Sequence, residues 1–180
     1  MKYCTECGTP VEFRIPQDDT LPRHVCPRCG MIHYQNPKLV VGCIAEWRGD
    51  ILLCRRAIEP RLGLWTLPAG FMENGESTLQ AALRETLEDA CAQVEIDALF
   101  SLINIPHIDQ VHLFYRGRLL DTDFSPGTES LETALFAESE IPWSELAFRS
   151  VTQCIKTYFT DRRTGVFDFH EATLMPPEGY

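Results

Sequence analysis

One stretch of the chain, residues 70–92, restricts the possible fold more than any other. It reads GFMENGESTLQAALRETLEDACA, and its pattern predicts a helix that begins near Ser77 and ends near position 92 or 93. Glu85, Glu88 and Asp89 stand three and four residues apart, so their carboxylates share one face of this helix. Like charges at this spacing repel each other by about 0.2–0.5 kcal/mol per pair. A divalent cation would relieve that repulsion, and hard oxygen ligands favour Mg²⁺ or Mn²⁺ over zinc.

The same stretch resembles the signature of the Nudix hydrolases, G-x5-E-x7-R-E-U-x-E-E-x-G-U, in which U is a bulky aliphatic residue. The matching positions are Gly70, Glu76, Arg84, Glu85 and Glu88. The departures are Thr86 for U, Asp89 for Glu, Cys91 for Gly and Ala92 for the last U. Without a glycine at position 91, we expect the chain to leave the helix in a less sharply left-handed conformation. A merely solvated, Glu-rich helix would not explain so many matches.

An apolar stripe along the predicted helix offers a face for burial. Its members are Leu79, Ala82, Leu83, Thr86, Leu87 and Ala90. We therefore expect the carboxylates on one side of the helix and the core of the domain on another.

The charge and hydropathy of the chain exclude several classes of protein. A net charge of −10 argues against a protein that grips nucleic-acid backbones, which needs clustered Lys and Arg. An anionic substrate would instead be bound through metal ions. No run approaches 18 apolar residues and the N-terminus lacks an apolar signal core, so we expect no membrane span and a cytoplasmic protein.

The cysteine spacing predicts a structural zinc site. Two C-x2-C pairs, each followed by glycine, supply the four thiolates of a tetrahedral site: Cys4, Cys7, Cys26 and Cys29. A redox role for the pairs is disfavoured because no βαβ unit surrounds them. His24 and His33 are alternative zinc ligands, but four cysteines already complete the site. Zinc would supply much of the folding energy of so small a module.

The other four cysteines lie in apolar contexts without any ligand spacing. We expect them to be buried, reduced thiols that pack as small hydrophobic side chains. They are Cys43, Cys54, Cys91 and Cys154.

The remaining pattern predicts a zinc ribbon over residues 1–34 and one α/β domain over residues 35–180. Apolar runs predict strands over residues 39–47, 51–56, 63–70, 93–96, 99–105, 111–119 and 135–136. A second helix is predicted over about 148–163, with an apolar stripe of Val151, Cys154, Ile155, Tyr158 and Phe159. The tail after Gly165 is expected to be peripheral. This order matches the α/β/α sandwich with a mixed β sheet that the Nudix resemblance implies.

That resemblance also implies the chemistry, which is cleavage of a nucleoside diphosphate linked to a second group. Glu85, Glu88 and Asp89, with a backbone carbonyl of Ala69, would hold Mg²⁺ or Mn²⁺, and Arg84 would pair with Glu76 or orient these carboxylates. Gly70 and Glu76 support the site. The general base is left open between Glu85 or Glu88 and a later loop glutamate, Glu132 or Glu129. Arg55 and Arg56 could reach the substrate phosphates.

The wider sequence resembles zinc-ribbon Nudix proteins related to FAD pyrophosphatases. The segments that carry this resemblance are YQNPKLVVGC, LWTLPAGFME and PG-x-ESLE. It implies hydrolysis of FAD to FMN and AMP, or of ADP-ribose to AMP and ribose 5-phosphate. By analogy with Nudix pyrophosphatases that take ADP-ribose, we expect a homodimer. Its partner would be a small-molecule nucleotide, with no nucleic acid and no membrane. The candidates for stacking on a base are Tyr34, Trp47, Phe71, Phe114 and Tyr115.

Two other functions stay open on the sequence alone. The first is hydrolysis of NADH or another nucleotide, although the SQPWPFP-type segment of NADH pyrophosphatases is absent. The second is a non-catalytic nucleotide sensor, suggested by the departures at Asp89 and Cys91.

Overall fold

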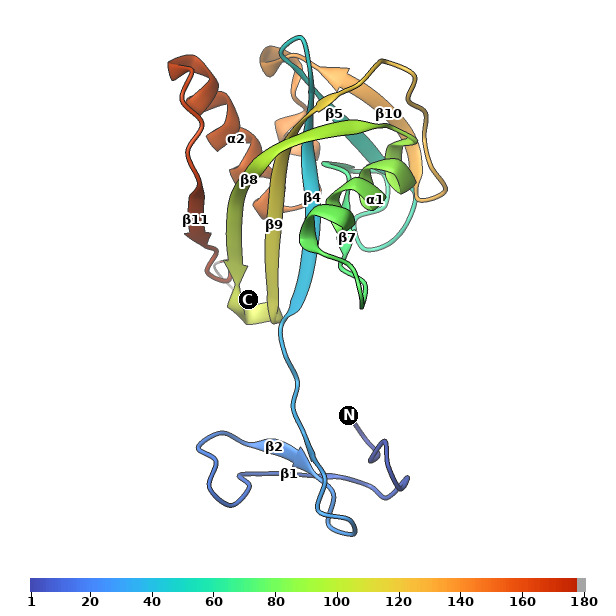
Figure 1. Ribbon diagram of the computed structural model, residues 1–180, viewed down its shortest axis with the longest axis vertical. Coiled ribbons are helices and arrows are strands. Elements are labelled where there is room, and N and C mark those ends of the chain that lie inside the picture. The colour runs from blue at the N-terminus through green and yellow to red at the C-terminus, as the bar shows by residue number, and fades with distance from the viewer. Residues whose placement is uncertain (178–180) are drawn as a thin grey trace. The chain divides into compact units, whose positions relative to one another are not determined.

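The computed structural model describes residues 1–177 and divides the chain into two compact units, Met1–Pro37 and Lys38–Tyr180 (Figure 1). The first unit is a three-stranded antiparallel sheet in the order β1-β2-β3. Its strands are β1 (Glu12–Arg14), β2 (Arg23–Val25) and β3 (Ile32–His33). In each C-x2-C turn the glycine after the second cysteine donates its N–H to the carbonyl of the first, as Gly8 to Cys4 and Gly30 to Cys26. Both glycines have a positive φ, which is why this residue follows each pair.

The second unit is built on an eight-stranded mixed sheet. Six strands follow the order β10-β5-β4-β9-β8-β11, while β6 pairs with β5 and β7 pairs with β4. Their bounds are β4 (Lys38–Trp47), β5 (Asp50–Arg56), β6 (Trp65–Thr66), β7 (Ala69–Phe71), β8 (Val94–Ile105), β9 (Gln110–Leu119), β10 (Ser130–Phe136) and β11 (His170–Thr173). The β4–β9 and β8–β11 pairs are parallel. Three short 3₁₀ turns lie at Pro106–Ile108, Glu138–Glu140 and Trp143–Glu145.

Two α-helices, α1 (Thr78–Ala90) and α2 (Arg149–Thr164), cover opposite faces of this sheet. Successive residues of a strand point to opposite faces, and the clusters of buried residues follow that rule. Leu113 of β9 packs in the cluster of α1, whereas Phe114 packs in the cluster of α2. The sandwich and its mixed sheet are therefore as predicted. Within residues 1–177, no helix has the length and apolar character needed to cross a membrane.

The predicted apolar stripe of α2 is confirmed, whereas that of α1 is partly wrong. All five apolar residues of the predicted stripe are buried: Val151, Cys154, Ile155, Tyr158 and Phe159. On α1, Ala82, Thr86 and Ala90 are buried, but Leu79 and Leu87 are 42% and 53% exposed. The short alanines allow α1 to approach the sheet closely, and the two leucines lie outside the face that makes this contact.

Contrary to expectation, the tail after Gly165 is not peripheral over its described part, residues 166–177; the last three residues lie outside the described part of the chain. Phe167 packs against the main core, and β11 adds a parallel strand beside β8. The chain after α2 therefore extends the sheet.

Cys91 departs from the prediction in two respects. The exit from α1 is fully left-handed despite the absence of glycine, since Cys91 has φ 48° and ψ 24°. Its N–H donates to the carbonyl of Leu87, so the closing hydrogen bond of the helix holds Cys91 in this conformation. This helix end leaves the Cys91 side chain exposed, whereas the thiols of Cys43, Cys54 and Cys154 are buried as expected.

Candidate active site

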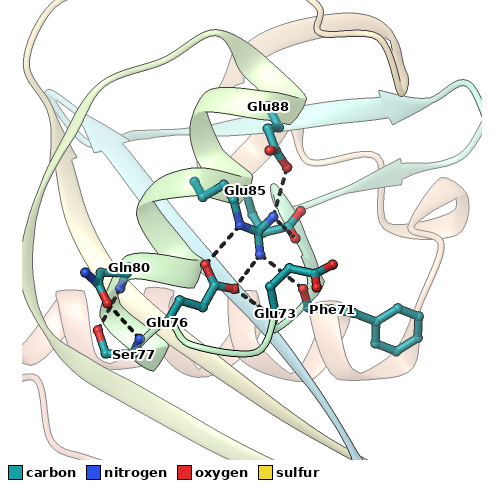
Figure 2. Close-up of polar contacts among 8 residues, drawn as sticks. Phe71, Glu73, Glu76, Ser77, Gln80, Glu85 and Glu88 are labelled. Carbon is teal, nitrogen blue, oxygen red and sulfur yellow. Dashed lines mark hydrogen bonds and ion pairs between the residues drawn. The ribbon is translucent and has the colours of Figure 1, made fainter.

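The start of α1 is fixed by a reciprocal capping box. The Ser77 hydroxyl accepts a hydrogen bond from the Gln80 N–H, and the Gln80 side chain accepts one from the Ser77 N–H (Figure 2). This cap sets where the helix begins and therefore which way each later side chain points. The carboxylates that follow at positions 85, 88 and 89 take their orientation from it.

Arg84 lies at the centre of an ion-pair network with Glu76, Glu85 and Glu88. Figure 2 shows these three carboxylates. Its guanidinium donates to both carboxylate oxygens of Glu76, at 3.0 and 2.7 Å. One Nη atom also contacts Glu85 at 2.7 Å and Glu88 at 2.9 Å, and the other donates to the Phe71 carbonyl at 3.1 Å. The hydrogen bonds with Glu76 contribute most to raising the pKa of Arg84, so it remains a cation throughout the physiological range. Arg84 thus joins the loop before α1 to the helix and orients two of the predicted metal ligands.

Glu85 is buried against the backbone of β7. A Cβ added at Gly70 would lie 2.3 Å from Oε2 of Glu85, so only glycine leaves room for this carboxylate. Burial raises the pKa of Glu85 to about 7, against the opposing effect of Arg84. Gly70 therefore supports the site by making space beside the helix.

Asp89 is hydrogen-bonded to the same strand. Its Oδ2 accepts the Ala69 N–H at 3.0 Å, which places the backbone of Ala69 beside the carboxylate. Burial raises the pKa of Asp89 to about 6, although the Ala69 hydrogen bond lowers it. The nearby charge of Glu129 acts in the same direction as burial. The shorter Asp in place of the family's Glu thus binds the first residue of β7.

These side chains line one end of a cavity of about 880 Å³. Arg84, Glu85, Glu88 and Asp89 reach it from α1, and Ala69 and Gly70 reach it from β7. Glu129 also lines this cavity, whereas Glu132 does not: it lies on β10 and pairs with Arg55 at 3.6 Å. Arg56 is in the lining and its guanidinium lies over the ring of Phe148, 5.1 Å from the centroid.

The donor set at this end suits a hard divalent cation, although its carboxylates are spread over the cavity wall. Within residues 1–177, only the four cysteines bring three or more ligating atoms within 4.8 Å of one another. As a group, the three carboxylates of α1 lie farther apart than that. Glu85 and Glu88 instead share the cation of Arg84. Glu85, which is buried, and Asp89, which is half-buried, both have raised pKa values. They are the groups that a bound cation would stabilise in the ionised form.

The cysteine cluster fits tetrahedral zinc. Sulfur–sulfur distances of 3.5 to 3.7 Å join Cys4, Cys7, Cys26 and Cys29. Four sulfurs about 2.3 Å from a central zinc would be roughly 3.8 Å apart, so little movement separates this arrangement from a zinc site. The Thr9 hydroxyl lies 3.4 Å from the Cys7 sulfur, and hydrogen bonding with Thr9 is the main reason that the pKa of Cys7 falls to about 6.

Three polar residues that no sequence motif marks also line the cavity. Gln110 and His112 reach it from β9, and Ser150 reaches it from the first turn of α2. Of the five aromatic candidates, Phe71 and Phe114 line the cavity. No local pattern marks the three polar residues, because β9 and α2 meet only in the folded domain.

The chain matches the family model described as "Nudix N-terminal" over residues 2–35 and the "NUDIX domain" model over residues 36–152. It is 27% identical over 165 residues to the NAD-capped RNA hydrolase NudC of Pseudomonas aeruginosa (strain LESB58), an alignment that covers 91% of this chain and 57% of that protein. The chain thus spans little more than half the length of that relative. It is 29% identical over 119 residues to the ADP-ribose pyrophosphatase of Methanocaldococcus jannaschii, covering 64% of this chain and 69% of that protein.

Among solved structures, the crystal structure of a NUDIX hydrolase from Nitrosomonas europaea is 55% identical to this chain and superposes with a TM-score of 0.94. The match covers 97% of this chain and 99% of the other. With the domain model matching more than half of the sequence, and the box residues gathered on α1 beside β7, the chain belongs to the Nudix family and carries an N-terminal zinc ribbon.

Proposed function

We propose that this protein is a metal-dependent hydrolase that cleaves the pyrophosphate of an ADP-containing nucleotide and releases AMP. The observation that carries the proposal is the cavity that joins the carboxylates of α1 to an apolar and hydrogen-bonding surface of the sheet. Its volume of about 880 Å³ is large enough for a dinucleotide. FAD and ADP-ribose are the proposed substrates, with FMN or ribose 5-phosphate as the second product.

Glu85, Glu88, Asp89 and the Ala69 carbonyl would hold Mg²⁺ or Mn²⁺. When bound, such ions neutralise the charge of the pyrophosphate and lower the pKa of a coordinated water. Arg84 keeps Glu85 and Glu88 on the side of α1 that lines the cavity. Its own contacts with Glu76 and the Phe71 carbonyl fix it in place, so its role is positioning.

The hydrolysis step adds water across one P–O bond of the anhydride. The water oxygen forms a bond to phosphorus, the bridging oxygen leaves with the second product, and the proton of the water passes to a general base. Glu129 is the loop glutamate that we propose for this role, because it lines the cavity and lies near Asp89. Glu132, held by Arg55 outside the lining, is the weaker candidate.

A substrate panel tests the proposal. Initial rates would be measured as release of the nucleoside monophosphate, which is AMP from FAD, ADP-ribose and NADH and 8-oxo-dGMP from 8-oxo-dGTP. Each substrate would be tested with Mg²⁺ and with Mn²⁺. We expect kcat/KM to be highest for FAD or ADP-ribose. A clear preference for NADH, or no hydrolysis of any of the four with either metal, would overturn the proposal.

A second candidate, hydrolysis of NADH or of NAD-capped RNA, is favoured by the similarity to the Pseudomonas relative over 91% of this chain. Adding an NAD-capped RNA to the panel, and following the release of nicotinamide mononucleotide from its cap, distinguishes an RNA-decapping enzyme from one that acts on small molecules. We also propose a homodimer. Light scattering during gel filtration tests it, with twice the chain mass of 20.5 kDa as the expected result.

A further inference from the structure

Two hydrogen bonds join three polar side chains in the wall of the cavity, and the series leads from a buried serine to a half-buried glutamine. The Ser150 hydroxyl lies 2.9 Å from Nδ1 of His112, and Nε2 of the same ring lies 2.9 Å from Oε1 of Gln110. Ser150 and His112 are 1% and 7% exposed, while Gln110 is half-buried and lines the cavity. All three residues line the cavity, but Gln110 is the most exposed of them and is therefore the one that a bound ligand can best reach.

The protons in this series can be placed by requiring every buried group to have a partner. Among residues 1–177, His112 is the one acceptor within reach of the Ser150 hydroxyl, so that O–H must donate to Nδ1. Burial lowers the pKa of His112 to about 4, so the ring is neutral at pH 7 and carries its single proton on Nε2. That N–H donates to Oε1 of Gln110. The orientation of the Gln110 amide is thus fixed, with its amino group left to donate elsewhere.

The surroundings of Gln110 suit a flat, mainly apolar ring. Gln110 is opposite Ile105 on β8, and His112, two positions along the same face of β9, is opposite Val40 on β4. Ile105 and Val40 both line the cavity, as does Ile108. A ring over these side chains would be largely desolvated, so a hydrogen bond at its edge would count strongly.

We propose that Gln110 recognises the adenine ring of the substrate, and that His112 and Ser150 are positioning residues that fix the direction of the Gln110 amide. Adenine presents an amino donor next to a ring-nitrogen acceptor. An amide can match this pair with its carbonyl and its amino group, as Gln does when it reads adenine in DNA. The inference rests on the proposed function, because FAD, ADP-ribose and NADH all share an adenine.

Hypoxanthine is the discriminating analogue, since it carries a carbonyl oxygen where adenine carries the amino group. A freely rotating amide would turn over and accept it. An amide held by His112 and Ser150 cannot turn without leaving a buried hydrogen bond unmade, so hypoxanthine should be rejected.

Calorimetric titration of the full-length protein with AMP and with IMP tests this, and it requires no turnover. We expect wild type to bind AMP at least about tenfold more tightly than IMP, within the range found for a bidentate amide–adenine pair. Gln110→Ala should bring the two dissociation constants to within about twofold of each other by weakening AMP. Ser150→Ala should also reduce the ratio, because His112 can then adopt either tautomer and the amide can turn. Gln153→Ala, an exposed residue of α2, is the matched control and should keep the wild-type ratio.

Equal affinities in wild type, no binding of AMP at millimolar concentration, or an unchanged ratio in folded Gln110→Ala would each overturn the proposal. Tryptophan fluorescence confirms that each variant is folded, and Ser150→Ala provides an independent test should Gln110→Ala not fold. Selective AMP binding by a protein that releases no AMP from FAD or ADP-ribose would refute the proposed function while leaving this inference intact.

Discussion

Replacing Glu85 by Gln should stabilise the protein at alkaline pH when Mg²⁺ and Mn²⁺ are absent. Burial raises the pKa of Glu85 from 4.5 to about 7, so the folded state holds a proton that the unfolded state has released. A group with a raised folded-state pKa stabilises the fold below its unfolded pKa, and that contribution is lost as pH rises through the folded pKa. The full loss is roughly 3 kcal/mol, of which about 1.4 kcal/mol falls between pH 6 and pH 8.

Urea unfolding at pH 6 and pH 8 measures this effect, well above the isoelectric point near 4.9. Tryptophan fluorescence is the signal, because Trp47, Trp65 and Trp143 all belong to the second unit. Wild type should lose more than 1 kcal/mol between these pH values, with Asp89 adding to the loss because its raised pKa of about 6 has the same sign. Glu85→Gln should lose clearly less and be more stable than wild type at pH 8.

Adding Mn²⁺ should abolish the stability advantage of Glu85→Gln over wild type at pH 8. A cation that binds the ionised Glu85 carboxylate stabilises wild type and not the variant. A wild-type stability that is flat or rises from pH 6 to pH 8 without metal would refute the reasoning. So would an equally steep loss in Glu85→Gln, since that would assign the effect to other groups.

Three further changes have defined outcomes. Cys91→Gly should raise the free energy of unfolding by about 0.5–1 kcal/mol in urea titrations, because glycine adopts the left-handed conformation at position 91 without steric cost; a loss would show that the Cys91 side chain stabilises the fold. Gly127→Ala should destabilise by about 1–3 kcal/mol and reduce kcat, because its Cβ would lie 1.7 Å from the Glu88 carbonyl oxygen and displace the loop that carries Glu129; wild-type stability and turnover would contradict this. Removing zinc should unfold residues 1–37, seen as loss of their dispersed amide NMR signals, and loss of the fluorescence-detected fold as well would show that the two units depend on each other.

Local patterns were enough to predict the helix of the active site and the cysteine cluster. The positions of Glu85, Glu88 and Asp89 follow from helical periodicity once Ser77 caps the helix. The cysteine cluster follows from two short turns whose geometry is set by glycine. In both cases the residues that matter are close in sequence, so their spacing determines their arrangement.

The choice between Glu129 and Glu132 could not be made in the same way. A register shift between Ser130 and Glu132 interrupts the alternation of side chains at the start of β10, and Glu129 lies in the loop before that strand. The preceding loop is also held on the end of α1, where Gly127 donates to the Asp89 carbonyl and Ser125 to the Ala90 carbonyl. Both effects depend on contacts between segments far apart in the chain.

The same limit applies to the three polar residues of the cavity wall and to the C-terminal strand. Gln110 and His112 read as ordinary strand residues, and only the approach of α2 brings Ser150 to the ring of His112. Pairing of β11 with β8 joins residues about seventy positions apart, such as His170 and Ser101. Neither the Ser150–His112 contact nor the β8–β11 pairing is marked by hydrophobic periodicity or by a sequence motif.

The most direct test of metal-dependent hydrolysis by the α1 carboxylates is an assay of AMP release from ADP-ribose and from FAD. It compares wild type with Glu85→Gln and Glu88→Gln, in Mg²⁺ or Mn²⁺. Glu140→Gln, an exposed glutamate of the turn at residues 138–140, serves as the matched control. We predict metal-dependent release by wild type and the control, and a loss of at least about a hundredfold in kcat for the two α1 variants, with their near-ultraviolet circular dichroism unchanged. Turnover by folded Glu85→Gln and Glu88→Gln at the wild-type rate would contradict the account.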